Sequence, residues 1–195
     1  MKKTYQFGKD RWNDQPLQIA YSYRFTETPE FIQNEDHIAG GINPHHREGF
    51  DNISLLCREV CSSGTRVTIH CAFEELGCPE IIFAEQPEVC PDGAVRYGAC
   101  FEVVLYKNGI NVWRHYRDEG QCHWHKRLGW EFPVAEGIKH TLSVDILPEE
   151  MLINIDGNRL SLRIEDMFGV FHPGITVCEG IARVYDMTVE PIPLS

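Results

Sequence analysis

HTLSVDILPEEMLINIDGNRLSLRI, residues 140–164, alternates apolar and polar side chains on both sides of an Asp156-Gly157 dipeptide. Strict alternation is typical of a half-buried β-strand, because successive side chains of a strand point to opposite faces. Asp-Gly favours a two-residue hairpin turn, since both residues tolerate a positive φ. The run therefore predicts a strand followed by a hairpin, with three cross-strand pairs: Ile155 with Asn158, Ile153 with Leu160, and Met151 with Leu162.

The same alternation recurs along the chain, in short runs separated by Gly, Pro, Asn and Asp. Clear examples are LQIAYSYRF at 17–25, RVTIHCAFEE at 66–75, CPEIIFAE at 78–85 and ITVCEGIARVYDMTVEP at 175–191. There is no sustained helical period, internal repeat or low-complexity linker. Ten or more short strands predict an all-β fold, an antiparallel β-sandwich or jelly roll. We expect one domain over residues 1–195, with residues 1–15 as an extended, polar N-terminal arm.

A central hairpin is predicted over residues 101–116, with its turn at Asn108-Gly109. One face is apolar and should join the core, although Arg114 falls on it. That conflict indicates either that the register is one residue off or that this end reaches solvent. The opposite face is polar and aromatic, with three expected pairs: Glu102 with His115, Val104 with Trp113, and Tyr106 with Asn111.

This polar face is the candidate site. Glu102 and His115 form a carboxylate–imidazole pair that can orient a sugar or move a proton, so they are the candidate catalytic residues. The candidate ligand-binding residues beside them are Tyr106, Asn111 and Trp113. The alternative is a surface ion pair that contributes less than about 1 kcal/mol.

Further histidines lie near this hairpin in the sequence. His123 and His125 point the same way on a strand, so they either extend the ligand surface or belong to an H-x-H metal motif. The metal alternative faintly resembles the first cupin motif, but Glu131 lies too far along the chain and no second motif follows. His70 can also extend the ligand surface, and the loop residues His45 and His46 can cap a cleft.

The run from residue 140, together with GIARVYDMTVEP at 180–191, resembles the concanavalin A-like lectin/glucanase superfamily, including its LamG-type members. The resemblance covers about residues 138–190. It implies two curved antiparallel sheets whose concave face binds carbohydrate, and it allows activity on glycosides. The E-x-D-x-E strand of the laminarinase-like members is missing, and so is the calcium and manganese loop of legume lectins. The resemblance therefore supports neither that hydrolytic mechanism nor a lectin metal site.

Charge and cysteine content bound the partners and the compartment. A net charge of −11 argues against nucleic acid and anionic membrane as partners, because both require a basic surface. No apolar run is long enough to span a membrane, and no secretory h-region follows Met1. The eight cysteines are therefore expected to be reduced thiols, which favours a cytoplasmic protein.

The leading interpretation is a carbohydrate-binding or carbohydrate-active jelly roll that recognises a sugar on the concave sheet face, without a metal or a cofactor. Two alternatives stay open at this point. One is a cupin-type metal-dependent enzyme that uses His123 and His125. The other is a structural or interaction domain without a small-molecule site.

Overall fold

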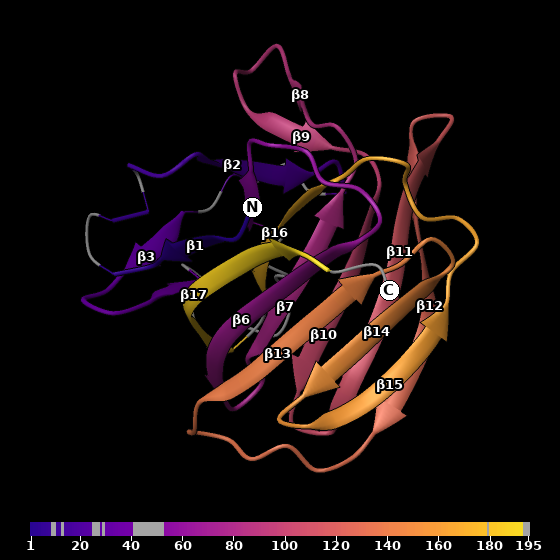
Figure 1. The fold of residues 1–195 in the computed structure, drawn as a ribbon. Helices are drawn as coiled ribbons and strands as arrows, with labels where there is room; N and C mark the ends of the chain where they lie inside the picture. Colours follow the sequence, from indigo (N-terminus) through magenta and orange to yellow (C-terminus); the bar gives the residue numbers. More distant parts are fainter. Residues whose placement is uncertain are drawn as a thin grey trace.

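Two curved β-sheets face each other in a computed structural model of the chain, which describes residues 1–8, 11–12, 14–24, 28, 30–40, 53–178 and 180–192 (Figure 1). The regular secondary structure of these residues is entirely β, as the alternating pattern predicts. None of them forms a helix long and apolar enough to cross a membrane.

Sheet A lies in front in Figure 1 and contains strands from both ends of the chain. Its short strand β1 (Lys3–Gln6) pairs with β17. The order of the remaining strands across the sheet is β15 (Asn158–Arg163), β14 (Glu150–Ile155), β13 (His140–Ile146), β6 (Thr65–Glu74), β17 (Ile181–Pro191), β4 (Ile38–Gly40) and β3 (Phe31–Gln33).

Sheet B lies behind sheet A and carries the central hairpin. Neighbouring strands are antiparallel except for the parallel pair formed by β2 and β9. The order across the sheet is β12 (Gln121–Glu131), β11 (Gly109–Asp118), β10 (Cys100–Tyr106), β7 (Cys78–Ala84), β16 (His172–Cys178), β5 (Ile53–Cys57), β2 (Leu17–Ser22), β9 (Val95–Tyr97) and β8 (Glu88–Val89).

The hairpin of β14 and β15 has the register that the sequence predicts. Ile155 faces Asn158, and the two following pairs agree as well. Asp156 and Gly157 both have positive φ, 49° and 92°, as a type I′ turn requires. The local alternation and the turn dipeptide are therefore sufficient to determine this hairpin.

The N-terminal segment differs from the expected polar arm. Residues 3–6 form β1 against β17, and the side chains of Tyr5 and Phe7 are buried in the core between the sheets. The hydrogen bonds of β1 come from β17, which is far away in the sequence. The short segment itself therefore carries no local signal strong enough to predict a strand.

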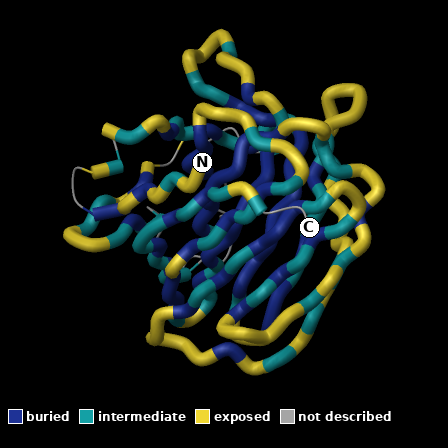
Figure 2. The backbone as a smooth tube through the Cα atoms, in the orientation of Figure 1, coloured by how far each residue is buried: buried dark blue, intermediate teal, exposed yellow. Residues whose placement is uncertain are grey.

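The main core fills the space between the sheets, where buried residues follow the middle of the strands and exposed residues the turns (Figure 2). A second, smaller cluster lies on the outward face of sheet B. Its buried residues are Tyr97, Ala20, Leu56, Ile82, Ala84 and Cys100. The Tyr97 hydroxyl is 2.9 Å from Ser54 Oγ. The middle of sheet B is therefore buried on both faces, which places the polar residues of β10 in a dry environment.

Candidate functional site

The central hairpin turns one residue earlier than the sequence predicts. Tyr106 pairs with Gly109, so Lys107 and Asn108 form the turn, and each residue of β10 faces a residue two positions earlier on β11 than expected. Only glycine suits position 109, because its φ is 131° and a Cβ there would lie 2.0 Å from the carbonyl oxygen of Trp130. β12 thus lies close against the turn, an approach that the local sequence does not encode, and we attribute the register to it.

The shift leaves the composition of the polar face unchanged. Side chains alternate with a period of two, so a two-residue displacement returns the same side chains to the same face. Glu102 now faces Trp113 directly and reaches His115 along the diagonal. The predicted contact is confirmed: His115 Nε2 lies 2.8 Å from Glu102 Oε2.

A third residue, which the sequence reasoning missed, joins this pair. Cys100 Sγ lies 3.7 Å from Glu102 Oε1. The three residues, here called the buried triad, are 0%, 5% and 8% exposed for Cys100, Glu102 and His115. Burial and the neighbouring carboxylate raise the pKa of the Cys100 thiol well above its usual range. A signal was available, because Cys100 and Glu102 are two residues apart on one strand and so share a face.

Next to the buried triad is a more accessible surface, here called the Trp113 patch, formed by Tyr106, Asn111, Trp113 and Lys126. The first three are half-buried, and the Lys126 ammonium lies 5.6 Å from the centre of the Trp113 ring. Asn111 Oδ1 has no hydrogen-bond partner among the described residues. The patch therefore combines an aromatic plane, an unsatisfied amide and a flexible lysine that covers both.

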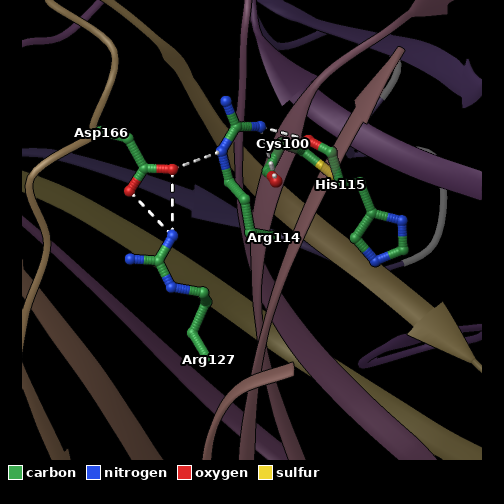
Figure 3. Close-up of polar contacts among 5 residues, drawn as sticks. All are labelled: Cys100, Arg114, His115, Arg127 and Asp166. Carbon is green, nitrogen blue, oxygen red and sulfur yellow. Dashed lines mark hydrogen bonds and ion pairs between the residues drawn. The ribbon is translucent and has the colours of Figure 1, made fainter. Parts of the chain in front are cut away.

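Arg114 supports the site from the inward side of β11. Its guanidinium lies between Asp166 and the backbone of the triad, where it donates hydrogen bonds to the carbonyl oxygens of Cys100, at 3.5 Å, and of His115 (Figure 3). It also lies 4.9 Å from the ring centre of Phe101. The Arg114 charge, which falls on an apolar face in the sequence, is thus paired with Asp166, stacked on Phe101 and hydrogen-bonded to the backbone of Cys100 and His115.

Replacing Arg114 by methionine is expected to lower the free energy of unfolding by about 2 kcal/mol, because buried carbonyl oxygens lose a charged donor while the apolar stem remains. Arg127→Met is the matched control. Arg127 contacts the same Asp166 at 2.9 Å, but its side chain is 32% exposed against 14% for Arg114. The control should lose less than about 1 kcal/mol. Urea unfolding measures both, and equal losses would contradict the supporting role of Arg114.

A cavity of about 560 Å³, here called the rim cavity, opens beyond the end of the buried triad. Its lining residues are Tyr23, Glu85, Gln86, Glu88, Arg96, Gly98, Arg117 and Gly120. The Arg117 guanidinium lies 4.2 Å from the centre of the Tyr23 ring. Hydrogen bonds to Cys90 and Glu88 raise the pKa of Tyr23 above its usual range. These residues come from loops and strand ends that are far apart in the sequence, which is why sequence reasoning missed them.

The predicted placement of His123 and His125 beside Glu102 is wrong. Both lie on β12 and point the same way, as expected, but they face Tyr116 and Arg114, on the opposite side of sheet B from His115. His123 stacks on Tyr116 with ring centres 5.0 Å apart. Within the described part of the chain, neither histidine joins a group of three metal-ligating side chains. The H-x-H metal motif of the cupin alternative thus has no third ligand there.

His70 is also misplaced by the sequence reasoning. It lies on β6 of sheet A, where its Nδ1 is 2.7 Å from Asp186 Oδ1. Side-chain alternation predicted its outward direction but not the sheet to which the strand belongs, so His70 cannot extend the face of Glu102. His45 and His46 lie outside the described residues.

Comparison with solved structures defines the fold class as a concanavalin A-like β-sandwich. The carbohydrate binding module CBM66 from Bacillus subtilis has a TM-score of 0.66 at 10% identity, over 90% of this chain and 96% of that chain. The pseudo β-1,3-glucanase of Mycobacterium tuberculosis has a TM-score of 0.61 at 10% identity, over 97% and 98%. The exoplasmic/lumenal domain of VIP36, in a form bound to Ca²⁺ and Man3GlcNAc, has a TM-score of 0.61 at 10% identity, over 98% and 90%.

At these identities the likeness is one of fold. The chain matches no family model and no curated protein sequence. The resemblance that the sequence carries over residues 138–190 is thus confirmed as a concanavalin A-like sandwich that spans nearly the whole chain.

Proposed function

We propose that this protein is a carbohydrate-binding protein whose ligand lies on the Trp113 patch and extends toward the rim cavity. The observation that carries the proposal is the pairing of a half-buried tryptophan plane with the unsatisfied Asn111 Oδ1 on one sheet face. An aromatic plane packs against the apolar face of a sugar ring, while an amide accepts a hydrogen bond from a hydroxyl.

Lys126 is the group that a sugar would displace. A Cβ at Gly129 would lie 3.3 Å from Lys126 Nζ and 3.4 Å from Asn111 Oδ1, so the end of the lysine fills the space that this glycine leaves. Lysine has a long flexible side chain and moves at little cost in enthalpy. Its departure opens both the Trp113 ring and the Asn111 amide to a ligand.

The neighbouring folds support this proposal. The solved structures with this architecture include a carbohydrate binding module and a domain bound to Man3GlcNAc. Binding is favoured over hydrolysis because Glu102 and His115 contact each other and are nearly sealed from solvent. The catalytic role of these two residues stays a prediction. Glu102→Gln should weaken ligand binding if the pair takes part in recognition.

Trp113→Ala is expected to weaken binding of the ligand roughly tenfold or more, since a central aromatic anchor contributes a large share of binding energy. A glycan array identifies the ligand, and isothermal titration calorimetry measures the loss. Unchanged affinity in Trp113→Ala, or an array without any bound glycan, would contradict the proposal.

Tyr185→Ala is the matched control for this experiment. Tyr185 is a half-buried aromatic residue on sheet A, and the Lys139 ammonium lies 3.7 Å from the centre of its ring. It therefore reproduces the lysine-covered aromatic arrangement of Trp113 on the other sheet. Its replacement should leave the affinity for the glycan unchanged.

The cytoplasmic location and the lack of nucleic-acid and membrane partners also remain proposals. They are supported by the net charge of −11 and by eight cysteines that are all free thiols. Fractionation of the source cells checks the location, and recovery outside the cytoplasm would refute it.

A further inference from the structure

The buried triad brings three different metal-ligating atoms together. Cys100 Sγ, a carboxylate oxygen of Glu102 and a ring nitrogen of His115 all lie within 4.8 Å of one another. Within the described ranges, no other group of three His, Cys, Asp or Glu side chains meets this condition. The proposed carbohydrate function makes no use of the thiol, so the convergence of these groups needs a separate explanation.

The strand geometry holds these atoms in place. Cys100 and Glu102 are alternate residues of β10, and His115 is the register partner of Cys100 on β11. On the opposite side of the hairpin, Arg114 donates hydrogen bonds to the carbonyl oxygens of Cys100 and His115 (Figure 3). Ligands carried by paired strands with a bonded backbone are positioned more rigidly than ligands on loops.

The spacing suits a tetrahedral ion. Zn²⁺ lies about 2.3 Å from a thiolate and about 2.0–2.2 Å from imidazole or carboxylate. At tetrahedral angles these bonds place sulfur about 3.6 Å from oxygen and nitrogen about 3.4 Å from oxygen. Cys100 Sγ lies 3.7 Å from Glu102 Oε1, and His115 Nε2 lies 2.8 Å from the other carboxylate oxygen, Oε2. A rotation of the Glu102 carboxylate with a small opening at His115 is therefore needed to bring one oxygen to both separations.

We propose that Cys100, Glu102 and His115 bind one divalent ion of the Zn²⁺ class, with a fourth position left for water or a ligand oxygen. Mixed sulfur, nitrogen and oxygen donors favour such borderline ions over Mg²⁺ or Ca²⁺, which prefer oxygen alone. The ion compensates the charges of the thiolate and the carboxylate, which are expensive to bury unpaired. This proposal does not depend on carbohydrate binding.

A nucleophilic cysteine is the main alternative role for the triad. Reactive thiols lie in electropositive, partly exposed surroundings that lower their pKa. Cys100 is fully buried, and its sulfur lies 3.7 Å from a carboxylate oxygen of Glu102. The surroundings of the thiol thus oppose nucleophilic chemistry, whereas a bound cation replaces the thiol proton and forms a bond to the sulfur.

Titration of the metal-free, full-length protein with Co²⁺ tests the proposal, with Zn²⁺ competition as a second measurement. We expect one ion per chain, the visible absorption of tetrahedral Co²⁺ and a thiolate-to-cobalt charge-transfer band. Cys100→Ser should remove the charge-transfer band. Glu102→Gln and His115→Gln should each weaken Zn²⁺ binding by at least roughly 100-fold, more than the loss of an outer-shell partner.

The double variant Cys122→Ser/His123→Gln is the matched control. It removes one thiol and one imidazole from neighbouring β12, outside the triad, and should leave stoichiometry, spectrum and affinity unchanged. Circular dichroism verifies that each variant is folded. The absence of stoichiometric binding by the unaltered protein would overturn the proposal whatever the variants do. So would Zn²⁺ affinities that stay the same in folded triad variants.

Discussion

Phe101→Ala is expected to lower the free energy of unfolding by about 3–5 kcal/mol, because a fully buried ring is lost from a core that cannot close around the hole. Phe101 lies on the inward side of β10, between two triad residues, with its ring centre 6.0 Å from that of Phe168. For a chain of this length the loss corresponds to a melting temperature lower by about 6–20 °C. Urea unfolding and calorimetry measure the two quantities.

Phe132→Ala is the control for this substitution. Phe132 is half-buried and has one aromatic neighbour, Trp130, at 4.5 Å between ring centres. Its truncation creates a smaller cavity and should lower the free energy of unfolding by about 1–2 kcal/mol, because less of the ring is buried. A loss at Phe132 as large as that at Phe101 would show that the core between the sheets does not determine stability in the way that burial indicates.

Gly109→Ala is the second substitution with a large expected effect, a loss of roughly 3 kcal/mol or more. A φ of 131° is strained for any residue with a Cβ, and the added carbon would lie 2.0 Å from the carbonyl oxygen of Trp130. Relief requires β12 to move away from the hairpin that carries the site. Urea unfolding gives the loss, and a changed glycan affinity would report displacement of the Trp113 patch.

Gly157→Ala separates the two causes. Gly157 also has positive φ, 92°, but a Cβ there meets no atom within 4 Å. This variant pays only the conformational penalty of about 1–2 kcal/mol. If Gly109→Ala were no more destabilising than Gly157→Ala, the close approach of Trp130 would not be what determines the register of the central hairpin.

The two hairpins show where local sequence suffices and where it does not. At Asp156-Gly157 the turn is free of other contacts, so its dipeptide and the flanking alternation predict the register correctly. At Asn108-Gly109 a third strand, β12, lies close to the turn. The same kind of dipeptide there predicts a turn one residue later than the structure has it. The predicted polar face is still correct, because the register between β10 and β11 differs from the prediction by two residues. A shift by an even number of residues leaves the same side chains on the same face.

The candidate site divides in the same way. Alternation along one hairpin predicts the Glu102–His115 contact. It also predicts that Tyr106, Asn111 and Trp113 lie on the same face as this pair. Alternation predicts which side chains lie on the same side of a strand. It does not predict which sheet the strand joins or which face of that sheet these side chains lie on. His123, His125 and His70 were therefore assigned to a surface that they do not share.

By itself, the sequence determined the all-β class, the concanavalin A-like pattern, the β14–β15 hairpin and the polar face of the central hairpin. Each of these depends on residues that are near one another in the chain. Tertiary structure alone decided the strand order of the two sheets, the burial of residues 3–7, the outward cluster under Tyr97 and the rim cavity. The physical reason is that antiparallel pairing and packing between sheets join segments far apart in sequence, whose mutual fit no local pattern records.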